Sequence, residues 1–233
     1  MNGGKNVLTG CVPTAVAQLM SIYKYPTTYN GQLYDWNKMT GETSAFYCSS
    51  DVQGQIAKLM AELGLPKHLN VAYGTSEEGG SGADSKNIPR TLSAFGYTSG
   101  GSIVNYDSSV LIEELKKGYP VLVSGFQYRD RVNILGIKFS YTYYTGHQWL
   151  AHGLLERRRL VSHHDTKGKV LYTYYESVFY PRYNWGWNGA CDGYFLSTVF
   201  DVNNKSFNDQ TRGKEGEEDN FQFNTKLVIN IRR

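Results

Sequence analysis

Apolar residues between positions 8 and 23 recur at three- and four-residue spacing, which predicts an amphipathic helix with one buried face. Thr9 is expected to cap this helix, and Pro13 is tolerated near its start because the N–H groups of the first turn have no helical partner. Segments with the same spacing follow at 52–63, 86–95 and 108–117, and each is followed by glycine. The first half of the chain is therefore predicted to be mainly helical. The buried positions of the first helix are Val12, Ala15, Val16, Leu19, Met20 and Tyr23.

The second half of the chain has the character of a sheet. Pro120 to Phe126 is a short apolar run of the kind that forms a buried strand. Further strands are expected at 132–145, 148–156, 169–180, 194–199 and 221–231, where Val, Ile, Tyr, Phe and Thr are frequent. A polar turn is expected at 161–168 and a long polar loop at 203–220. Helices that precede antiparallel strands indicate the α+β class, with two lobes and a site between them.

Chain length and net charge limit the domain organisation and the kind of partner that we expect. A chain of 233 residues can form one large domain or two lobes that share a cleft. The net charge of +3 is small, and no cluster of Lys and Arg alternates with aromatic residues, so nucleic acid is not expected as the main partner. The run 157–159, three arginines, is interpreted as a solvated strand end or turn. There is no secretory signal and no transmembrane run, and we expect the natural start of the chain to lie upstream.

The three cysteines are Cys11, Cys48 and Cys191, and they form no metal-binding motif. Because their number is odd, at least one thiol is unpaired, while a bridge between Cys48 and Cys191 stays open. Cys11 begins the first helix, where unpaired N–H groups and the helix dipole favour an anion and can lower the pKa of a thiol. The alternative is a small, inert core cysteine.

Two later segments carry residues that such a thiol would need. His147 follows Cys11 at the separation of roughly 130–150 residues that is typical of papain-type enzymes, and Asn184 comes after it. The histidine would form the ion pair with the thiolate, and the Asn184 amide would accept a hydrogen bond from Nδ1 of the histidine. Trp185 would shield that bond from water. Singly, each residue has an ordinary structural explanation, as a strand histidine or a turn residue.

These motifs resemble the streptopain family of bacterial cysteine peptidases. The resemblance rests on Thr-Gly-Cys-Val-x-Thr-Ala-x-Ala-Gln-x-Met at 9–20, on Gly146-His147, on Asn-Trp-Gly-Trp at 184–187, and on shorter matches in the same order between them. It implies a papain-like fold as one domain over 1–233, with a helical lobe at about 1–118 and a β-rich lobe at about 119–233. It also implies Cys11 as nucleophile, His147 as base, and Asn184 and Trp185 as supports of the histidine. Members are typically secreted as zymogens, so a secreted or cell-envelope location and an inhibitory N-terminal propeptide are implied as well.

The chain departs from the family in two places. The family usually has Gly-His-Ala-Phe-Val-x-Asp-Gly, whereas this chain has Gly-His-Gln-Trp-Leu-Ala-His-Gly at 146–153. His152 therefore stands at the family's Asp and is a rival base, although His147 follows the motif glycine and is preferred. The family's oxyanion-hole Gln precedes the nucleophile, yet none of the ten residues before Cys11 is Gln. The N–H of Cys11 is one oxyanion donor, and the second has no candidate. We therefore expect Cys11 to alkylate readily while peptide hydrolysis is weak.

The sequence thus predicts a cysteine endopeptidase that acts on protein or peptide substrates and needs no metal or organic cofactor. The loops at 73–85 and 203–220 are expected to border the substrate cleft. Two alternatives stay open. One is a catalytically impaired relative that binds peptides, and the other is an acyl-transfer enzyme of transglutaminase or amidase type with the same residues. The expected cleft residues are Tyr73, Gly74, Ser81, Gly82, Ala83, Gly146 and Trp187.

Overall fold

The computed structural model describes the chain except residues 1–6, 43, 76–79, 135–136, 198–199 and 201–219. Its helices are α1 (Cys11–Tyr23), α2 (Trp36–Met39), α3 (Ser50–Gly64), α4 (Ile88–Ala94) and α5 (Ser108–Lys116), with short 3-10 turns at Ala45–Tyr47 and Ser85–Asn87. Its strands are β1 (Thr28–Tyr29), β2 (Gln32–Leu33), β3 (Ser99–Asn105), β4 (Val121–Ile134), β5 (Ile137–His164), β6 (Val170–Asn184), β7 (Gly193–Tyr194) and β8 (Phe223–Arg232).

The four predicted helices are present, and the first has the predicted buried face, although Tyr23 at its end is only partly buried. Its cap differs from the prediction, because Gly10 is the N-cap and makes no side-chain capping bond. Thr9 instead approaches Thr14, whose hydroxyl donates to the Gly10 carbonyl. Gly10 has φ 87°, and a Cβ there would lie 2.9 Å from the Ser81 carbonyl oxygen. Glycine is therefore required by both backbone conformation and space.

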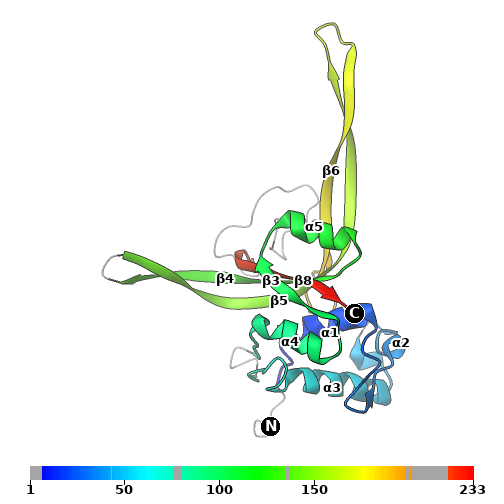
Figure 1. Ribbon diagram of the computed structural model, residues 1–233, viewed down its shortest axis with the longest axis vertical. Helices are drawn as coiled ribbons and strands as arrows, with labels where there is room; N and C mark the ends of the chain where they lie inside the picture. Colours follow the sequence, from blue (N-terminus) through cyan, green and yellow to red (C-terminus); the bar gives the residue numbers. More distant parts are fainter. Residues whose placement is uncertain (1–6, 43, 76–79, 135–136, 198–199, 201–219) are drawn as a thin grey trace.

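The sheet confirms the α+β class. Six strands pair antiparallel in the order β3-β8-β4-β5-β6-β7, with α1, α2, α3 and α4 below the sheet in Figure 1 and α5 on its other side. β3 was not predicted, because its Gly- and Ser-rich sequence lacks a clear alternation of apolar residues.

Several predicted strand boundaries are wrong. β5 runs without a break through 145–148 and continues to His164. Of the predicted turn at 161–168, only residues 165–168 therefore form a turn. Arg157, Arg158 and Arg159 lie inside this strand and pair with β6. Both faces of that part of β5 are exposed, so polar residues occupy it freely and the pattern does not mark a strand. The predicted strand at 194–199 is reduced to β7, and the predicted loop at 203–220 lies almost wholly outside the described residues.

Two cores lie on opposite faces of the sheet. Leu122 and Leu150 face the core that α1, α3 and α4 complete, whereas Val123 and Trp149 face the core that includes α5. Side chains alternate between faces along a strand, so neighbouring residues of β4 and β5 serve different cores. Each fully buried apolar side chain contributes roughly 1.5–3 kcal/mol, and both cores therefore hold β5 in register.

Two long hairpins leave this body (Figure 1). We call residues 127–145 the β4–β5 arm and residues 155–179 the β5–β6 arm. In the second arm, Leu155 to His163 pair with Tyr172 to Tyr180. β5 therefore lies in the central sheet at its middle and in a projecting ribbon at each end.

Candidate active site

A pocket of about 790 Å³ lies where the first turn of α1 meets strands β4 and β5. Cys11 and His147 both line it. One wall is the segment 80–86, and the opposite wall comes from 124–126 and 145–148. Of the predicted cleft residues, this pocket takes in Ser81, Gly82, Ala83 and Gly146.

Cys11 is held at the helix start with its side chain half-buried. Burial raises the pKa of the Cys11 thiol above its ordinary value, although the N–H groups of Gln148, Cys11 and Val12 point to the sulfur and oppose that rise. The expectation that the helix start lowers this pKa is therefore wrong for the resting thiol, because loss of water outweighs the donors. A thiolate here needs a proton acceptor close by.

A hydrogen bond and aromatic packing both hold His147. Its Nε2 atom lies 2.8 Å from the Trp185 carbonyl oxygen. A carbonyl only accepts, so Nε2 carries the proton and the neutral ring has its lone pair on Nδ1. The ring also packs against Trp185, Trp187 and Phe221, at centroid distances of 6.1, 4.8 and 5.0 Å. The tryptophans of 184–187 therefore hold the histidine from the side, in the region the sequence proposed.

Asn184 is attached to the nucleophile helix. Its Oδ1 accepts from Nε2 of Gln18, at 2.8 Å, and from the N–H of Gly186, at 2.9 Å. The Trp185 N–H in turn donates to Asp192, at 2.9 Å. The acceptor at the protonated nitrogen of His147 is the Trp185 carbonyl, and Nδ1, which was expected to donate to Asn184, carries no proton in this tautomer, so a supporting role of Asn184 stays a prediction. Gln18 was not singled out from the sequence, although it lies seven residues after Cys11 on the same side of α1.

Gln148 is a second polar residue that the sequence did not assign to the site. Its side chain is only 2% exposed and bridges two elements. Oε1 accepts from the Ser85 hydroxyl at 2.7 Å, and Nε2 donates to the Val123 carbonyl at 2.8 Å. Together with its N–H at the Cys11 sulfur, these bonds tie the 80–86 wall to β5 beside the nucleophile. The available signal was its departure from the family's Ala at this position.

The 80–86 wall is also tied to the segment that precedes Cys11. The Ser81 hydroxyl donates to the Leu8 carbonyl and accepts from the N–H of Gly74. Gly74 therefore supports the wall from behind, although it is outside the set of residues that lines the pocket.

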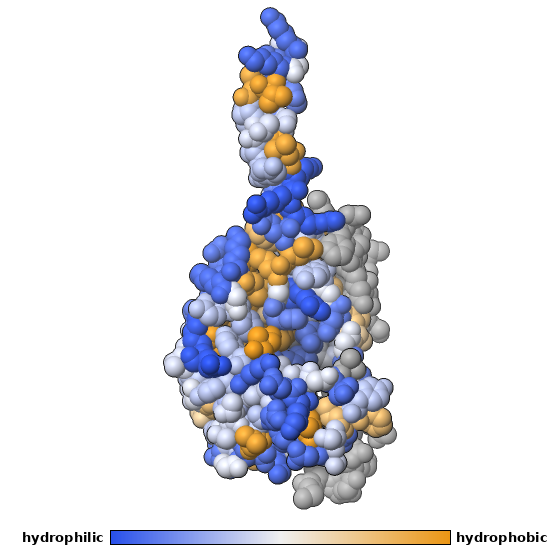
Figure 2. All heavy atoms as spheres, turned by 90° about the vertical axis from the view of Figure 1, so that its right-hand side faces the viewer, coloured by the Kyte–Doolittle hydropathy of each residue, from blue (hydrophilic) through white to orange (hydrophobic). Residues whose placement is uncertain are grey.

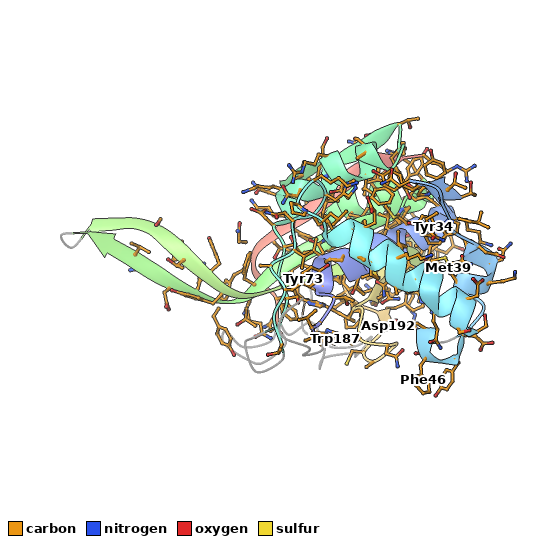
Figure 3. All side chains as sticks on the ribbon, turned by 90° about the horizontal axis from the view of Figure 1, so that it is seen from below. Tyr34, Met39, Phe46, Tyr73, Trp187 and Asp192 are labelled. Atoms are coloured by element: carbon orange, nitrogen blue, oxygen red, sulfur yellow. The ribbon has the colours of Figure 1, made fainter. Side chains whose placement is uncertain are left out.

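Tyr73 lies in a separate hollow of about 510 Å³ with Leu8, Phe46 and Met60. Phe46 projects outward from the helical side of the molecule (Figure 3). The structure therefore divides the predicted 73–85 border between two hollows.

His152, the rival base, is the extra residue of a β-bulge between Ala151 and Gly153. Burial lowers the pKa of His152, the Arg182 charge lowers it further, and the Asp192 charge opposes both. It is not among the residues that line the Cys11 pocket, whereas His147 is.

Within the described ranges, no three His, Cys, Asp or Glu side chains are grouped to hold a metal ion, and no helix has the length and apolar character needed to cross a bilayer. Cys11, Cys48 and Cys191 are all free thiols, so Cys48 and Cys191 are unbridged.

The sequence of the chain also matches known proteins. The sequence model of the peptidase C10 family matches residues 1–195. Streptopain from Streptococcus pyogenes is 26% identical over an alignment that covers 82% of this chain and 46% of that protein. The chain therefore spans about half the length of this curated relative.

Proposed function

Because the chain belongs to the peptidase C10 family, the family of streptopain, we propose that it is a cysteine endopeptidase with Cys11 as nucleophile and His147 as general base. Family membership supports a cysteine peptidase in general. The observation that carries the residue roles is that Cys11 and His147 line one pocket while the residue after the histidine donates its N–H to the sulfur.

The protonation of His147 sets the direction of the first step. Nε2 holds its proton for the Trp185 carbonyl, so Nδ1 is the atom that accepts the thiol proton. The resulting thiolate attacks the scissile carbonyl, and the imidazolium then protonates the leaving amine. A water molecule, deprotonated by Nδ1, hydrolyses the acyl-enzyme and returns the thiol.

The surroundings favour this transfer over simple ionisation of the thiol. Burial opposes an isolated thiolate, whereas an imidazolium beside it compensates the charge. The three N–H groups that face the sulfur also stabilise the anion. The N–H of Cys11 is proposed as one oxyanion donor, and Asn184 and Trp185 as the residues that keep the histidine in place.

The remaining expectations extend this proposal. We propose a single papain-like domain over 1–233, with lobes at about 1–118 and 119–233 and a substrate polypeptide bound between the 80–86 wall and β4. Protein substrates are supported by the family, and a secreted location and an inhibitory propeptide by the resemblance alone.

A second candidate, a catalytically impaired peptide-binding relative, is favoured by two observations. The pKa of the Cys11 thiol is raised, and the second oxyanion donor is unassigned. An acyl-transfer activity with the same residues stays an alternative, which amine incorporation into a peptide would reveal.

The test compares the chain with Cys11→Ala. An epoxide should modify Cys11 in preference to Cys48 and Cys191, as read by mass spectrometry of digested protein, and a quenched peptide should be cleaved only by the unchanged chain. Modification of Cys11 without cleavage would favour the impaired relative. Equal modification of all three thiols would contradict the proposal.

A further inference from the structure

The β5–β6 arm leaves the body as a two-stranded ribbon with no third strand. Within the described chain, β6 pairs with β5 along its length and with β7 only at Arg182 and Tyr183. β5 pairs with β4 only up to Ala151. Both outer edges of the arm therefore present unpaired backbone groups. An isolated two-stranded hairpin is marginally stable in water, and three or more strands are generally needed.

Large apolar side chains cover both faces of this arm. Tyr175 is 67% and Leu171 61% exposed. Figure 2 shows hydrophobic side chains on the projecting arm between hydrophilic stretches. Exposure of this extent on one short element marks an interaction surface. The exposed set is Leu160, Val170, Leu171, Tyr172, Tyr174, Tyr175 and Val178.

The two edges of the arm differ in charge. The β5 edge carries three consecutive arginines at 157–159, of which Arg158 is paired with Glu156 and Arg159 with Glu176, and charged side chains on an edge discourage strand addition. The β6 edge carries no charged side chain from Val170 to Tyr175. The run is flanked by Lys169 and Glu176, and Glu176 is paired with the Arg159 guanidinium across the ribbon. The β6 edge is therefore the one open to another strand.

We propose that the β6 edges of two copies of this chain pair antiparallel, so that two marginal ribbons become one four-stranded sheet. A second copy fits this edge better than a charged strand would. The uncharged run of one copy then meets the same run of the other, with the same length and the same β-forming residues. Antiparallel pairing also brings Lys169 of each copy toward Glu176 of the partner subunit. That carboxylate has acceptor sites for this lysine in addition to Arg159.

Pairing of identical edges closes after two copies, because it forms a two-fold interface. Pairing of the β5 edge with the β6 edge would instead leave an open edge at each end and produce chains of copies. The arginines at 157–159 discourage that arrangement. The proposal does not depend on catalysis, since the arm is remote in sequence from Cys11 and shares no residue with its pocket.

The test is sedimentation equilibrium of the whole chain over a wide range of concentrations. We expect a monomer–dimer equilibrium, and Thr173→Lys should raise its dissociation constant by at least about tenfold by placing like charges near the two-fold axis. Thr173 is exposed at the middle of the β6 run. Thr142→Lys is the matched control, because Thr142 is an exposed strand residue of the β4–β5 arm and should leave the constant unchanged.

Leu171→Lys provides a second, independent variant and should act like Thr173→Lys. A monomer at every concentration would overturn the proposal, and so would association equally weakened by Thr142→Lys. Growth beyond the dimer would overturn the two-fold arrangement. If the unchanged chain is monomeric at every concentration and Thr173→Lys no longer cleaves a folded protein substrate, the β6 edge would instead bind strands of the substrate.

Discussion

The backbone N–H of Gln148 faces the sulfur of Cys11 and favours its thiolate form, so the residue after the proposed base lies directly against the proposed nucleophile. This places the first turn of α1 directly against the backbone of β5. Movement of β5 by one residue would separate the thiol from its donor and carry His147 to the other face of the sheet. The position of His147 relative to Cys11 therefore depends on the register of β5.

His147→Ala should slow alkylation of Cys11 by iodoacetamide at neutral pH by at least about tenfold, because only the thiolate reacts. Burial raises the pKa of the Cys11 thiol, so without its proton acceptor the midpoint of the alkylation profile should lie above the ordinary thiol value. The measurement is the rate of modification across the pH range, with Cys48 as internal control. An unchanged profile would show that His147 does not pair with the thiol.

His152→Gln should leave the same alkylation profile unchanged, because His152 is outside the pocket. It should alter stability instead. Burial holds the pKa of His152 below its unfolded value, so the unfolded chain binds a proton more readily as the pH falls through about 6.5. The stability present above that pH is lost in acid, and the variant should lose less of it.

Urea unfolding of both proteins at neutral pH and at pH about 5 measures the difference. His68 is also buried with a lowered pKa, so part of the acid sensitivity should persist in His152→Gln. A variant with the full acid sensitivity of the unchanged chain would contradict the assignment.

Gln148→Ala should raise the KM for peptide substrates with little change in alkylation by a small reagent. The change leaves Ser85 and the Val123 carbonyl without their partner, at a cost of roughly 1–3 kcal/mol in stability, and frees the 80–86 wall. Ser85→Ala removes the same connection from the other side.

The two changes should be strongly non-additive in kcat/KM, because each alone breaks one shared bond. Additive losses from Ser85→Ala and Gln148→Ala would mean that the bridge does not position the wall. An equal loss of alkylation rate would indicate general damage to the site.

Gly10→Ala should destabilise the chain more than Gly31→Ala. Both glycines have positive φ, which costs an alanine roughly 1–2 kcal/mol. Only at Gly10 would the new Cβ meet a backbone oxygen, that of Ser81, at 2.9 Å, whereas nothing lies within 4 Å at Gly31. Thermal unfolding of the two variants isolates this clash. Equal shifts in the midpoint temperature of unfolding would show that the 80–86 wall moves away from the new Cβ without cost.

Periodicity predicted α1 well, because its buried face repeats over four turns and local spacing determines a helix. Periodicity did not predict the length of β5, since residues 156–164 are exposed to solvent on both faces and need no alternation of apolar and polar side chains. Cys11 and His147 were proposed as site residues from their order and spacing. Gln18 and Gln148 were not, because their bonds to Asn184 and Ser85 join segments far apart in sequence and depend on how the helices pack against the sheet.

The continuity of β5 has a consequence for how this sequence tolerates change in length. Between Gly146 and Ala151 the strand is paired with β4, and a single inserted residue would reverse which side chains face the pocket. Beyond Glu156 it is paired only with β6, so matched insertions near the turn at 165–168 would lengthen the arm and leave the thiol and histidine undisturbed. Homologous sequences should therefore vary in arm length at that turn, while the number of residues from Gly146 to Ala151 should stay at six.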